Sequence, residues 1–393
     1  MKKVYLIDGA RTAFTAFGGS FASVTATELG TVTAKEALKR SNVAPDHVDH
    51  VIYGNVIHSE TNAAYIARHI GLDAGVPKEV PAYILNRLCG SGLQSIVSGV
   101  QEILLNDAEI VLAGGVENMS QAPYSNFEKR FGGGKLGELK FHDMLLSTLF
   151  DEYTGFGMGV TAENLAKAYH ISRTEQDEYA VLSHERASKA RESGRFSEEI
   201  VAVDVKLRKK NESIIEDEHI KPDTTVEKIS GLRPSFKKDG TVTAANASGI
   251  NDGAASVVIA SEQAVNEHGL QPLAEIVSWA VSGVDPSVMG IGPVPAIKKA
   301  LEKARLPLEK IDLIEVNEAF AAQYLAVEKE LGLDREKTNV NGGAIALGHP
   351  VGVSGTRLAL SAAYELRNSD KEYALVSLCI GGGQGIAMVI KRS

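Results

Sequence analysis

The chain has 393 residues, of which 44% are hydrophobic and 23% are charged, a composition typical of soluble globular proteins. This length exceeds the range over which one hydrophobic core keeps growing, so we expect two or three domains. The formal net charge of −9 argues against a nucleic-acid-binding protein, and the presence of only two cysteines argues against a fold held together by disulfides.

The first apolar segment, Val4-Tyr5-Leu6-Ile7, predicts a buried strand. It is too short for a signal peptide because Asp8 and Arg11 interrupt it. The longest apolar stretch, residues 374–390, is broken by Gly381-Gly382-Gly383-Gln384-Gly385, which favours two buried strands around a tight turn over a membrane span. We therefore expect a cytoplasmic protein that binds no membrane.

Residues 1–120 and 264–393 resemble each other at one fixed offset of 263 positions (37 and 300, for instance), which indicates an internal duplication. In each copy an amphipathic helix leads into an apolar strand, and a Gly/Ser turn opens a second helix before another strand. This alternation predicts α/β layers with a buried, mainly parallel sheet. The aligned pairs are Ala37-Leu38 with Ala300-Leu301, Val48-Asp49 with Ile311-Asp312, Ser91-Gly92 with Ser354-Gly355, Asp107 with Asp370, and Glu109 with Glu372. The expected helices are 34–40, 90–105, 296–304 and 354–366, and the expected strands are 110–113 and 373–379.

The segment between the copies is richer in charge, and long excursions from a repeated scaffold usually carry binding surface. It contains a glycine cluster at 132–134, a helical run at 162–192 and an alternating strand at 201–207; a strand at 254–260 then returns to the first copy. A basic patch at Lys206, Arg208, Lys209 and Lys210 is most simply a solvated strand end. We expect an N-terminal half of residues 1–120 plus 248–263, a loop domain of 121–247 and a C-terminal half of 264–393.

Cys89 lies in Asn86-Arg87-Leu88-Cys89-Gly90-Ser91-Gly92, on a predicted turn directly before a helix. Backbone N–H groups at a helix start and the positive end of its dipole favour a thiolate. The pattern therefore predicts a nucleophilic cysteine with a lowered pKa. The alternative is an inert buried thiol, the common state of a free cysteine.

His349 lies among glycines and is followed by Pro350, so little bulk surrounds the imidazole. This setting favours a histidine that acts on a substrate, although a lone histidine is more often structural. Asn317, at the end of a predicted strand, would position a water or cap a helix.

Cys379 ends a predicted strand, and the glycines after it expose N–H groups suited to an oxyanion hole. The repeat offset pairs Cys89 with Gly352 and Cys379 with Val116, so the cysteines are not copies of one another. We therefore expect Cys89 and Cys379 to have distinct roles. Cys-x-x-Cys and His-Glu-x-x-His do not occur in the sequence, and its Gly-x-Gly turns lack a following Lys-Ser/Thr, so we expect no metal site and no nucleotide phosphate loop.

Together these motifs resemble the thiolase family: Cys-Gly-Ser-Gly-Leu-Gln at Cys89, Asn-Glu-Ala-Phe at Asn317, Gly-His-Pro at His349 and Cys-x-Gly-Gly-Gly at Cys379. The resemblance covers nearly the whole chain and is greatest to acetyl-CoA acetyltransferases and 3-ketoacyl-CoA thiolases. It implies a five-layered α-β-α-β-α fold built from two duplicated halves, with an inserted loop domain that covers coenzyme A. It also implies a homotetramer, a dimer of dimers.

The resemblance further implies reversible Claisen condensation of two acetyl-CoA to acetoacetyl-CoA and CoA, or thiolysis of 3-ketoacyl-CoA, with coenzyme A thioesters as substrates and no permanently bound cofactor. Cys89 would carry the acyl group, His349 would activate it, and Cys379 would remove or return a proton at the α-carbon. Asn317 would hold a water in one oxyanion hole. The N–H groups of Cys89 and Gly381 would form the second.

Further residues match family positions around the acyl and pantetheine channel or coenzyme A, although each is equally compatible with plain core. Acetoacetyl-specific relatives often carry histidine where Gly157 stands here, so a wider pocket with another substrate preference is open. Lys221 stands where some relatives use arginine near the coenzyme phosphates. The implied contacts are Met158, Phe236, Ala244, Ala319, Phe320, Met289, Leu149, Ser248 and Lys221.

Four alternatives stay open at this point. A broader-chain 3-ketoacyl-CoA thiolase of fatty-acid β-oxidation would use the same residues. A ketoacyl synthase would pair its cysteine with two histidines or with His and Asn, which Cys379 disfavours. A non-catalytic acyl-CoA- or lipid-binding protein would have lost a reactive residue, and none is lost here. A redox protein would need its two cysteines together in one turn.

Overall fold

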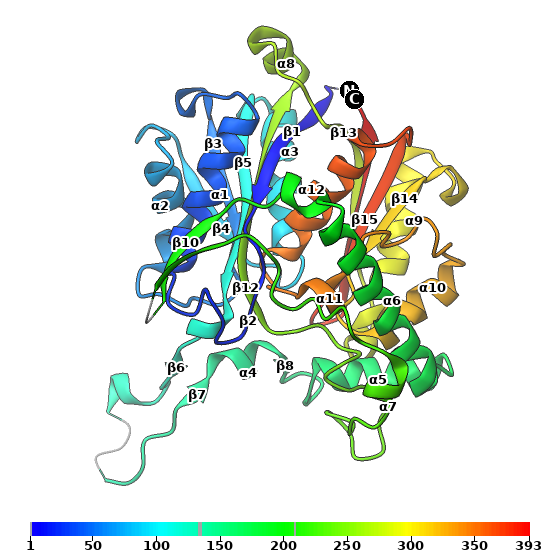
Figure 1. Ribbon diagram of the computed structural model, residues 1–393. Coiled ribbons are helices and arrows are strands. Elements are labelled where there is room, and N and C mark those ends of the chain that lie inside the picture. The colour runs from blue at the N-terminus through cyan, green and yellow to red at the C-terminus, as the bar shows by residue number, and fades with distance from the viewer. Residues whose placement is uncertain (1, 133–135, 208–209) are drawn as a thin grey trace.

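The computed structural model describes residues 2–132, 136–207 and 210–393 (Figure 1). Most of the expected glycine cluster at 132–134 and two residues of the expected basic patch, Arg208 and Lys209, lie outside the described residues.

A mixed sheet of ten strands runs through the described residues, with β2 (Thr15–Ala16) beside one of its central strands, β12. Its order is β14 (Leu313–Val316), β15 (Tyr373–Ile380), β16 (Gln384–Arg392), β13 (Ala274–Gly283), β1 (Val4–Arg11), β12 (Asn251–Ser261), β5 (Ile110–Asn118), β3 (His50–Gly54) and β4 (Ala82–Leu85). Strands β1 and β13 join the two halves through the pairs Tyr5–Glu275 and Leu6–Ala274. Each half is therefore nearly a sheet of its own.

The prediction of a mainly parallel sheet is wrong. The pairs β14–β15, β3–β4 and β3–β5 are parallel, whereas every pair from β15 through to β5 is antiparallel. In each half one strand runs back between two others: β12 lies between β1 and β5, and β16 lies between β13 and β15. Both strands were expected from the sequence, but the local alternation of strand and helix does not reveal the direction in which they run.

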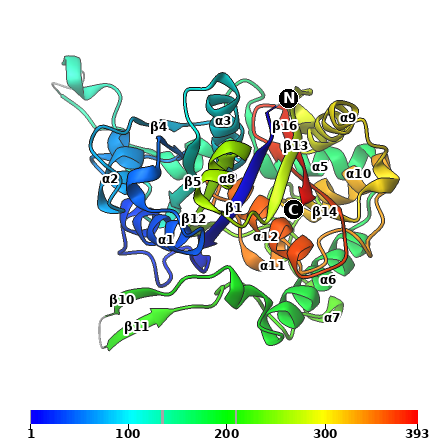
Figure 2. The same cartoon turned by 90° about the horizontal axis from the view of Figure 1, so that it is seen from above.

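Helices cover both faces of each half-sheet and produce five layers (Figures 1 and 2). One outer layer holds α1 (Ala26–Arg40) and α2 (Ile66–Asp73), and the other holds α9 (Pro293–Ala304) and α10 (Ala321–Leu331). Between the two half-sheets lie α3 (Ser91–Leu105) and α12 (Ser354–Arg367), which contact each other. The predicted five-layered fold from two duplicated halves is confirmed.

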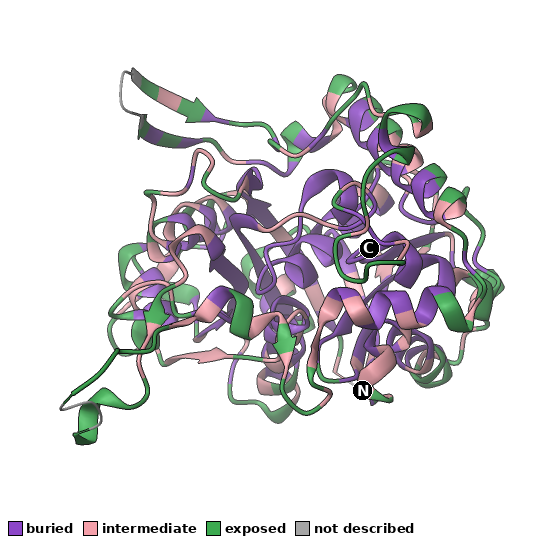
Figure 3. Ribbon diagram, turned by 90° about the horizontal axis from the view of Figure 1, so that it is seen from below, coloured by how far each residue is buried: buried purple, intermediate pink, exposed green. Residues whose placement is uncertain are grey.

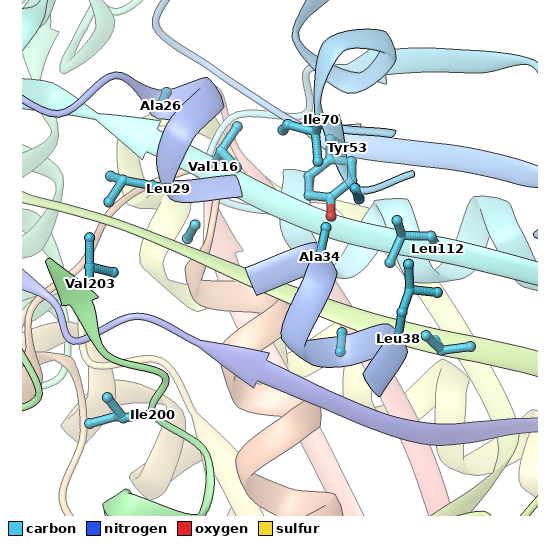
Figure 4. Close-up of a cluster of buried hydrophobic side chains, with 14 of the residues drawn as sticks. Ala26, Leu29, Ala34, Leu38, Tyr53, Ile70, Leu112, Val116, Ile200 and Val203 are labelled. Carbon is cyan, nitrogen blue, oxygen red and sulfur yellow. The ribbon is translucent and has the colours of Figure 1, made fainter. Parts of the chain in front are cut away.

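Helix α1 begins earlier than the predicted 34–40 because a capping box precedes it. The Thr25 side chain accepts the N–H of Glu28, and the Glu28 carboxylate accepts the N–H of Thr25; such caps contribute about 1 kcal/mol. The helix buries one face against the sheet and α2 (Figure 4). The packed side chains include Ala26, Leu29, Ala34 and Leu38 of the helix, Tyr53 and Ile70, and Leu112 and Val116 of β5.

The inserted segment contains two long helices where one run at 162–192 was predicted. Helix α5 (Met158–Ala168) ends before His170, whose φ of 51° is left-handed, and α6 (Arg173–Glu192) begins after a second capping box, Ser172 with Glu175. The shorter elements here are β6 (Tyr124–Ser125), β7 (His142–Asp143), α4 (Met144–Thr148), β8 (Phe150–Asp151), β9 (Phe156–Gly157), β10 (Val203–Leu207), β11 (Lys210–Ile214) and α7 (Val226–Ser230). Elsewhere lie α8 (Glu262–His268) and α11 (Ala344–Leu347).

An arm based on β6 and β7 projects from the body and is largely exposed (Figure 3). It carries several large apolar side chains in solvent, among them Phe127 at 71%, Phe131 at 94% and Leu136 at 96% exposure. Within the described ranges, no helix is both long enough and apolar enough to cross a membrane.

Candidate active site

The N-terminal ends of α3 and α12 meet at the centre of the molecule, and glycines allow the close approach. The Thr356 hydroxyl of α12 donates to the Gly92 carbonyl of α3 at 2.9 Å. A Cβ added at Gly355 would lie 2.3 Å from the backbone nitrogen of Leu93. This contact places the turn that carries Cys89 beside the loop that carries His349.

Cys89 is half-buried in an apolar cluster that also contains Leu149 and Val351, the second residue after His349. Burial raises its pKa to about 11, while the N–H groups of Gly381 and of Cys89 itself lower the pKa. The predicted lowering of the pKa is therefore wrong, because loss of water outweighs the two donors. The resting side chain is a thiol, and a base must take its proton before it attacks.

Cys379 is 1% exposed in β15, in the half opposite Cys89. Its pKa is raised, first by burial and then by the charge of Cys89. The two sulfurs therefore lie close enough to repel each other as thiolates, although one comes from each half of the duplication. Both are free cysteines.

His349 is buried and held on three sides. Its Nδ1 lies 2.5 Å from Oγ of Ser354, its Nε2 lies 3.4 Å from Nδ2 of Asn317, and its backbone N–H donates to Oδ1 of Asn251 at 3.0 Å. Burial, and then the nearby charge of Arg357, lower its pKa to about 4. The imidazole is thus neutral near pH 7 and able to accept a proton.

Asn317 is fully buried directly after β14, and its backbone N–H donates at 2.9 Å to the carbonyl of Ser377, two residues before Cys379. Its Oδ1 is buried and has no hydrogen-bond partner among the described residues. The helix-capping alternative is wrong, since the next helix, α10, has Phe320 at its N-cap.

Two thiolase family models match the chain, that of the N-terminal domain over residues 4–263 and that of the C-terminal domain over residues 270–392. The chain belongs to the thiolase family. Human mitochondrial 3-ketoacyl-CoA thiolase is 53% identical over 100% of this chain and 99% of its own. Acetyl-CoA acetyltransferase of Escherichia coli K12 is 49% identical over 100% of both chains.

Solved thiolase structures match this chain along its whole length. A crystal structure of the human mitochondrial 3-ketoacyl-CoA thiolase has a TM-score of 0.97, covering 100% of this chain and 99% of that one. A structure of the same human enzyme in complex with CoA also has a TM-score of 0.97, covering 100% of this chain and 98% of the other. Both are 53% identical to this chain.

Several of the residues expected along the acyl channel share an apolar cluster with one of the two cysteines. Met158, Met289, Ala319 and Phe320 belong to the same apolar cluster as Cys379. The sulfur of Met158 would lie 3.4 Å from a Cβ added at Gly381, and Leu149 packs in the cluster of Cys89. The ring of Phe236 meets that of Phe320 edge to face at 6.0 Å between centroids.

The residues expected at coenzyme A differ in exposure and contacts. The N–H of Ser248 donates to the Ala319 carbonyl at 3.0 Å, which ties Ser248 to the channel. Ala244 and Lys221 are exposed. The Lys221 charge lowers the pKa of His219, whose ring would lie 2.7 Å from a Cβ at Gly249, beside Ser248.

Several residues that support the site were missed from the sequence. The buried carboxylate of Glu117 accepts the N–H groups of Val56, Ile57 and Gly352 at 3.1, 2.9 and 2.9 Å, and burial raises its pKa to about 8. Asn251 and Ser354 hold His349. Of these residues, only Ser354 could have been found from the sequence, because it lies five residues after His349 and matches Ser91 at the repeat offset. Among the described residues, no group of three or more His, Cys, Asp or Glu could hold a metal.

Proposed function

We propose that this chain is an acyltransferase that interconverts two acetyl-CoA with acetoacetyl-CoA and CoA, or that cleaves 3-ketoacyl-CoA with CoA. The carrying observation is a pair of unlike thiols that interact with each other. The neutral His349 is linked to Cys89 through Val351, which packs in the same cluster, and to the Cys379 strand through Asn317. One thiol to carry an acyl group and one to move a proton is what this chemistry requires. The names of the relatives at 53% and 49% identity agree with either direction.

In the first half-reaction Cys89 attacks the thioester carbonyl of an acyl-CoA, and its proton passes to the neutral His349. Coenzyme A leaves as a thiolate and takes a proton from Cys379, so the acyl group remains on Cys89 as a thioester, His349 keeps the Cys89 proton and Cys379 is left as a thiolate. Because one thioester replaces another, the step is close to balanced and reversible.

In the second half-reaction Cys379, as a thiolate, removes a proton from the α-carbon of a second acetyl-CoA. Its raised pKa makes that thiolate a strong base. The N–H groups of Cys89 and Gly381 stabilise the oxygen that becomes negative, and Asn317 orients a water at the other carbonyl through its buried Oδ1. The new carbanion attacks the acyl-Cys89 carbonyl, and the Cys89 thiolate leaves and takes its proton back from His349.

A broader-chain 3-ketoacyl-CoA thiolase is the second candidate, and Gly157 favours it. Gly157 precedes Met158 at the start of α5 and leaves room where acetoacetyl-specific relatives often carry histidine. Turnover across C4 to C16 3-ketoacyl-CoA substrates separates the two. Activity confined to C4 supports the acetyl-specific enzyme, and a maximum at C8 or longer supports the broader one.

The two cysteine roles are tested by labelling with acetyl-CoA that carries a radioactive acetyl group. We expect Cys89→Ala to retain no label after denaturation. Cys379→Ala should label to the same extent as the unmodified enzyme but fail to exchange the α-proton of acetyl-CoA with solvent. Equal labelling of Cys89→Ala and the unmodified enzyme would defeat the assignment.

The proposal also covers the loop domain, the oligomeric state and the location in the cell. Residues 121–247 form a loop domain over coenzyme A, with Ser248, Lys221, Ala244 and Phe236 near the coenzyme. A homotetramer is supported by the apolar side chains exposed on the arm. A cytoplasmic location stays a prediction, because one of the relatives is named mitochondrial.

A further inference from the structure

The Ser354 hydroxyl contacts the imidazole of His349. Ser91, its equivalent in the other half, shows which hydrogen bonds such a hydroxyl forms. Ser354 is the first residue of α12 and Ser91 is the first residue of α3, and the two match at the repeat offset. Both are buried, at 1% and 0% exposure. Both hydroxyls sit where the preceding loop turns into the helix.

In the N-terminal half the direction of each hydrogen bond is certain. The Ser91 hydroxyl donates to the Leu88 carbonyl at 2.7 Å and accepts the backbone N–H of Arg87 at 2.8 Å. A carbonyl can only accept and an amide N–H can only donate. The single hydroxyl hydrogen therefore points to the carbonyl.

In the C-terminal half a similar pattern recurs with two exchanges: the carbonyl lies four residues before the serine instead of three, and a ring nitrogen replaces the backbone N–H. The Ser354 hydroxyl donates to the Pro350 carbonyl at 3.1 Å, and its oxygen lies 2.5 Å from Nδ1 of His349. When the one hydroxyl hydrogen is assigned to the carbonyl, as in Ser91, the hydrogen between the serine and the ring belongs to Nδ1. The ring nitrogen takes the place that the Arg87 amide has in the first half.

The contact on the opposite side of the His349 ring supports the same assignment of the proton to Nδ1. Nε2 of His349 lies 3.4 Å from Nδ2 of Asn317, and an amide nitrogen is a donor only. Nε2 must then present a lone pair. Asn251 binds the backbone N–H of His349 and so places the loop, but this contact does not distinguish the ring nitrogens.

We propose that Ser354 is a positioning residue that holds His349 in the tautomer with the proton on Nδ1, so that Nε2 is its only proton acceptor. The consequence for catalysis rests on the proposed function, because Nε2 is then the atom that takes the Cys89 proton. A histidine protonated on Nε2 would have its basic nitrogen facing Ser354, away from Asn317.

The tautomer is read directly from the nitrogen NMR spectrum of the protein with ¹⁵N-labelled histidine. The His349 signals are assigned by their loss in His349→Gln. We expect Nδ1 to be the protonated nitrogen and Nε2 the unprotonated one. A proton on Nε2 overturns the proposal, whatever the activity of the enzyme.

The role of the hydroxyl is tested with Ser354→Ala. We expect both tautomers in its spectrum and a 10- to 100-fold slower acylation of Cys89 in a single turnover, with the KM for acetyl-CoA within twofold. Ser95→Ala is the matched control, since Ser95 is buried in α3 and its hydroxyl bonds only the Gly92 carbonyl, at 2.8 Å. An unchanged tautomer and rate in Ser354→Ala overturn the proposal. Failure of the unmodified enzyme to acylate, with Nδ1 still protonated, would reject the proposed function alone.

Discussion

At the scale of single residues, burial sets the protonation of the reaction centre. It raises the pKa of Cys89 to about 11 and lowers that of His349 to about 4. With the pKa of the thiol so far above that of the imidazole, the resting pair is neutral rather than a thiolate beside an imidazolium. In the proposed reaction, proton transfer then accompanies attack on the thioester, where we expect the N–H groups of Cys89 and Gly381 and the side chain of Asn317 to offset the developing charge.

The lowered pKa of His349 makes the folded protein sensitive to acid. Between about pH 6.5 and about pH 4 the unfolded chain binds a proton at His349 more readily than the folded protein does. The contribution of His349 to the free energy of unfolding is therefore complete above about pH 6.5 and is lost as the pH falls through about 4. We expect the free energy of unfolding of His349→Gln to fall less steeply between these pH values. The difference in slope should reach at most about 1.4 kcal/mol per pH unit, measured by urea denaturation.

A second buried histidine provides the comparison. Burial also lowers the pKa of His184 to about 4, so His184→Gln should flatten the same curve, and the double variant should flatten it further. A His349→Gln curve parallel to that of the unmodified protein would show that His349 is protonated equally in the folded and unfolded states.

Sequence reasoning singled out Cys89, His349 and Cys379 because each lies in a compact glycine-containing motif, and Asn317 because it follows a predicted strand. It could not reach Asn251 or Glu117, since their partners are distant in the chain: Asn251 binds a residue 98 positions away, and Glu117 binds Gly352, 235 positions away. The wrong pKa for Cys89 has a different cause. Helix position can be read from a sequence, whereas the desolvation that outweighs it depends on tertiary packing.

At the scale of elements, the site depends on how closely α3 and α12 approach. We expect Gly355→Ala to cost about 1–3 kcal/mol of folding free energy, because its Cβ would meet backbone atoms of Leu93 at 2.3–3.0 Å and the helices must separate. Acylation of Cys89 should slow as well. Urea denaturation and acetyl-CoA labelling check both.

Gly231→Ala is the control for that substitution. Gly231 has a negative φ of −78°, and an added Cβ would have no atom within 4 Å. The free energy of unfolding of Gly231→Ala should differ from that of the unmodified protein by less than about 0.5 kcal/mol. If the two alanine variants unfold at the same urea concentration, the helix contact does not limit stability.

The element boundaries show which local signals carry information. The helices at 90–105 and 354–366 were predicted within one residue of α3 and α12, because apolar periodicity and a Gly/Ser start agree there. The run at 162–192 was joined in error, although Ser172 and Glu175 form a readable capping box. Strand direction carries no local signal, so β12 and β16 were predicted as strands but their antiparallel direction was missed.

At the scale of the whole molecule, a buried ionic cluster fastens the inserted segment to the N-terminal half. Arg11 of β1 bonds Glu199 at 2.9 Å and Asp217 at 2.7 Å, and all three side chains are 0% exposed. Removing one partner of such a cluster leaves a buried charge unpaired, which is strongly destabilising. The inserted segment is therefore held against the body by charge as well as by apolar packing.

The exposed arm leads to the last prediction, which concerns assembly. Phe127 and Phe131 are 71% and 94% exposed, and apolar side chains gathered on one projection indicate a protein contact surface. We expect the unmodified protein to form a tetramer of 41.9 kDa chains and the double variant Phe127→Glu, Phe131→Glu to form dimers, as measured by light scattering after gel filtration. The control is Leu105→Glu, which also places a charge on an exposed apolar site (69%) but at the end of α3. A tetramer that survives the arm variant, or dissociates equally in the control, would place the contact elsewhere.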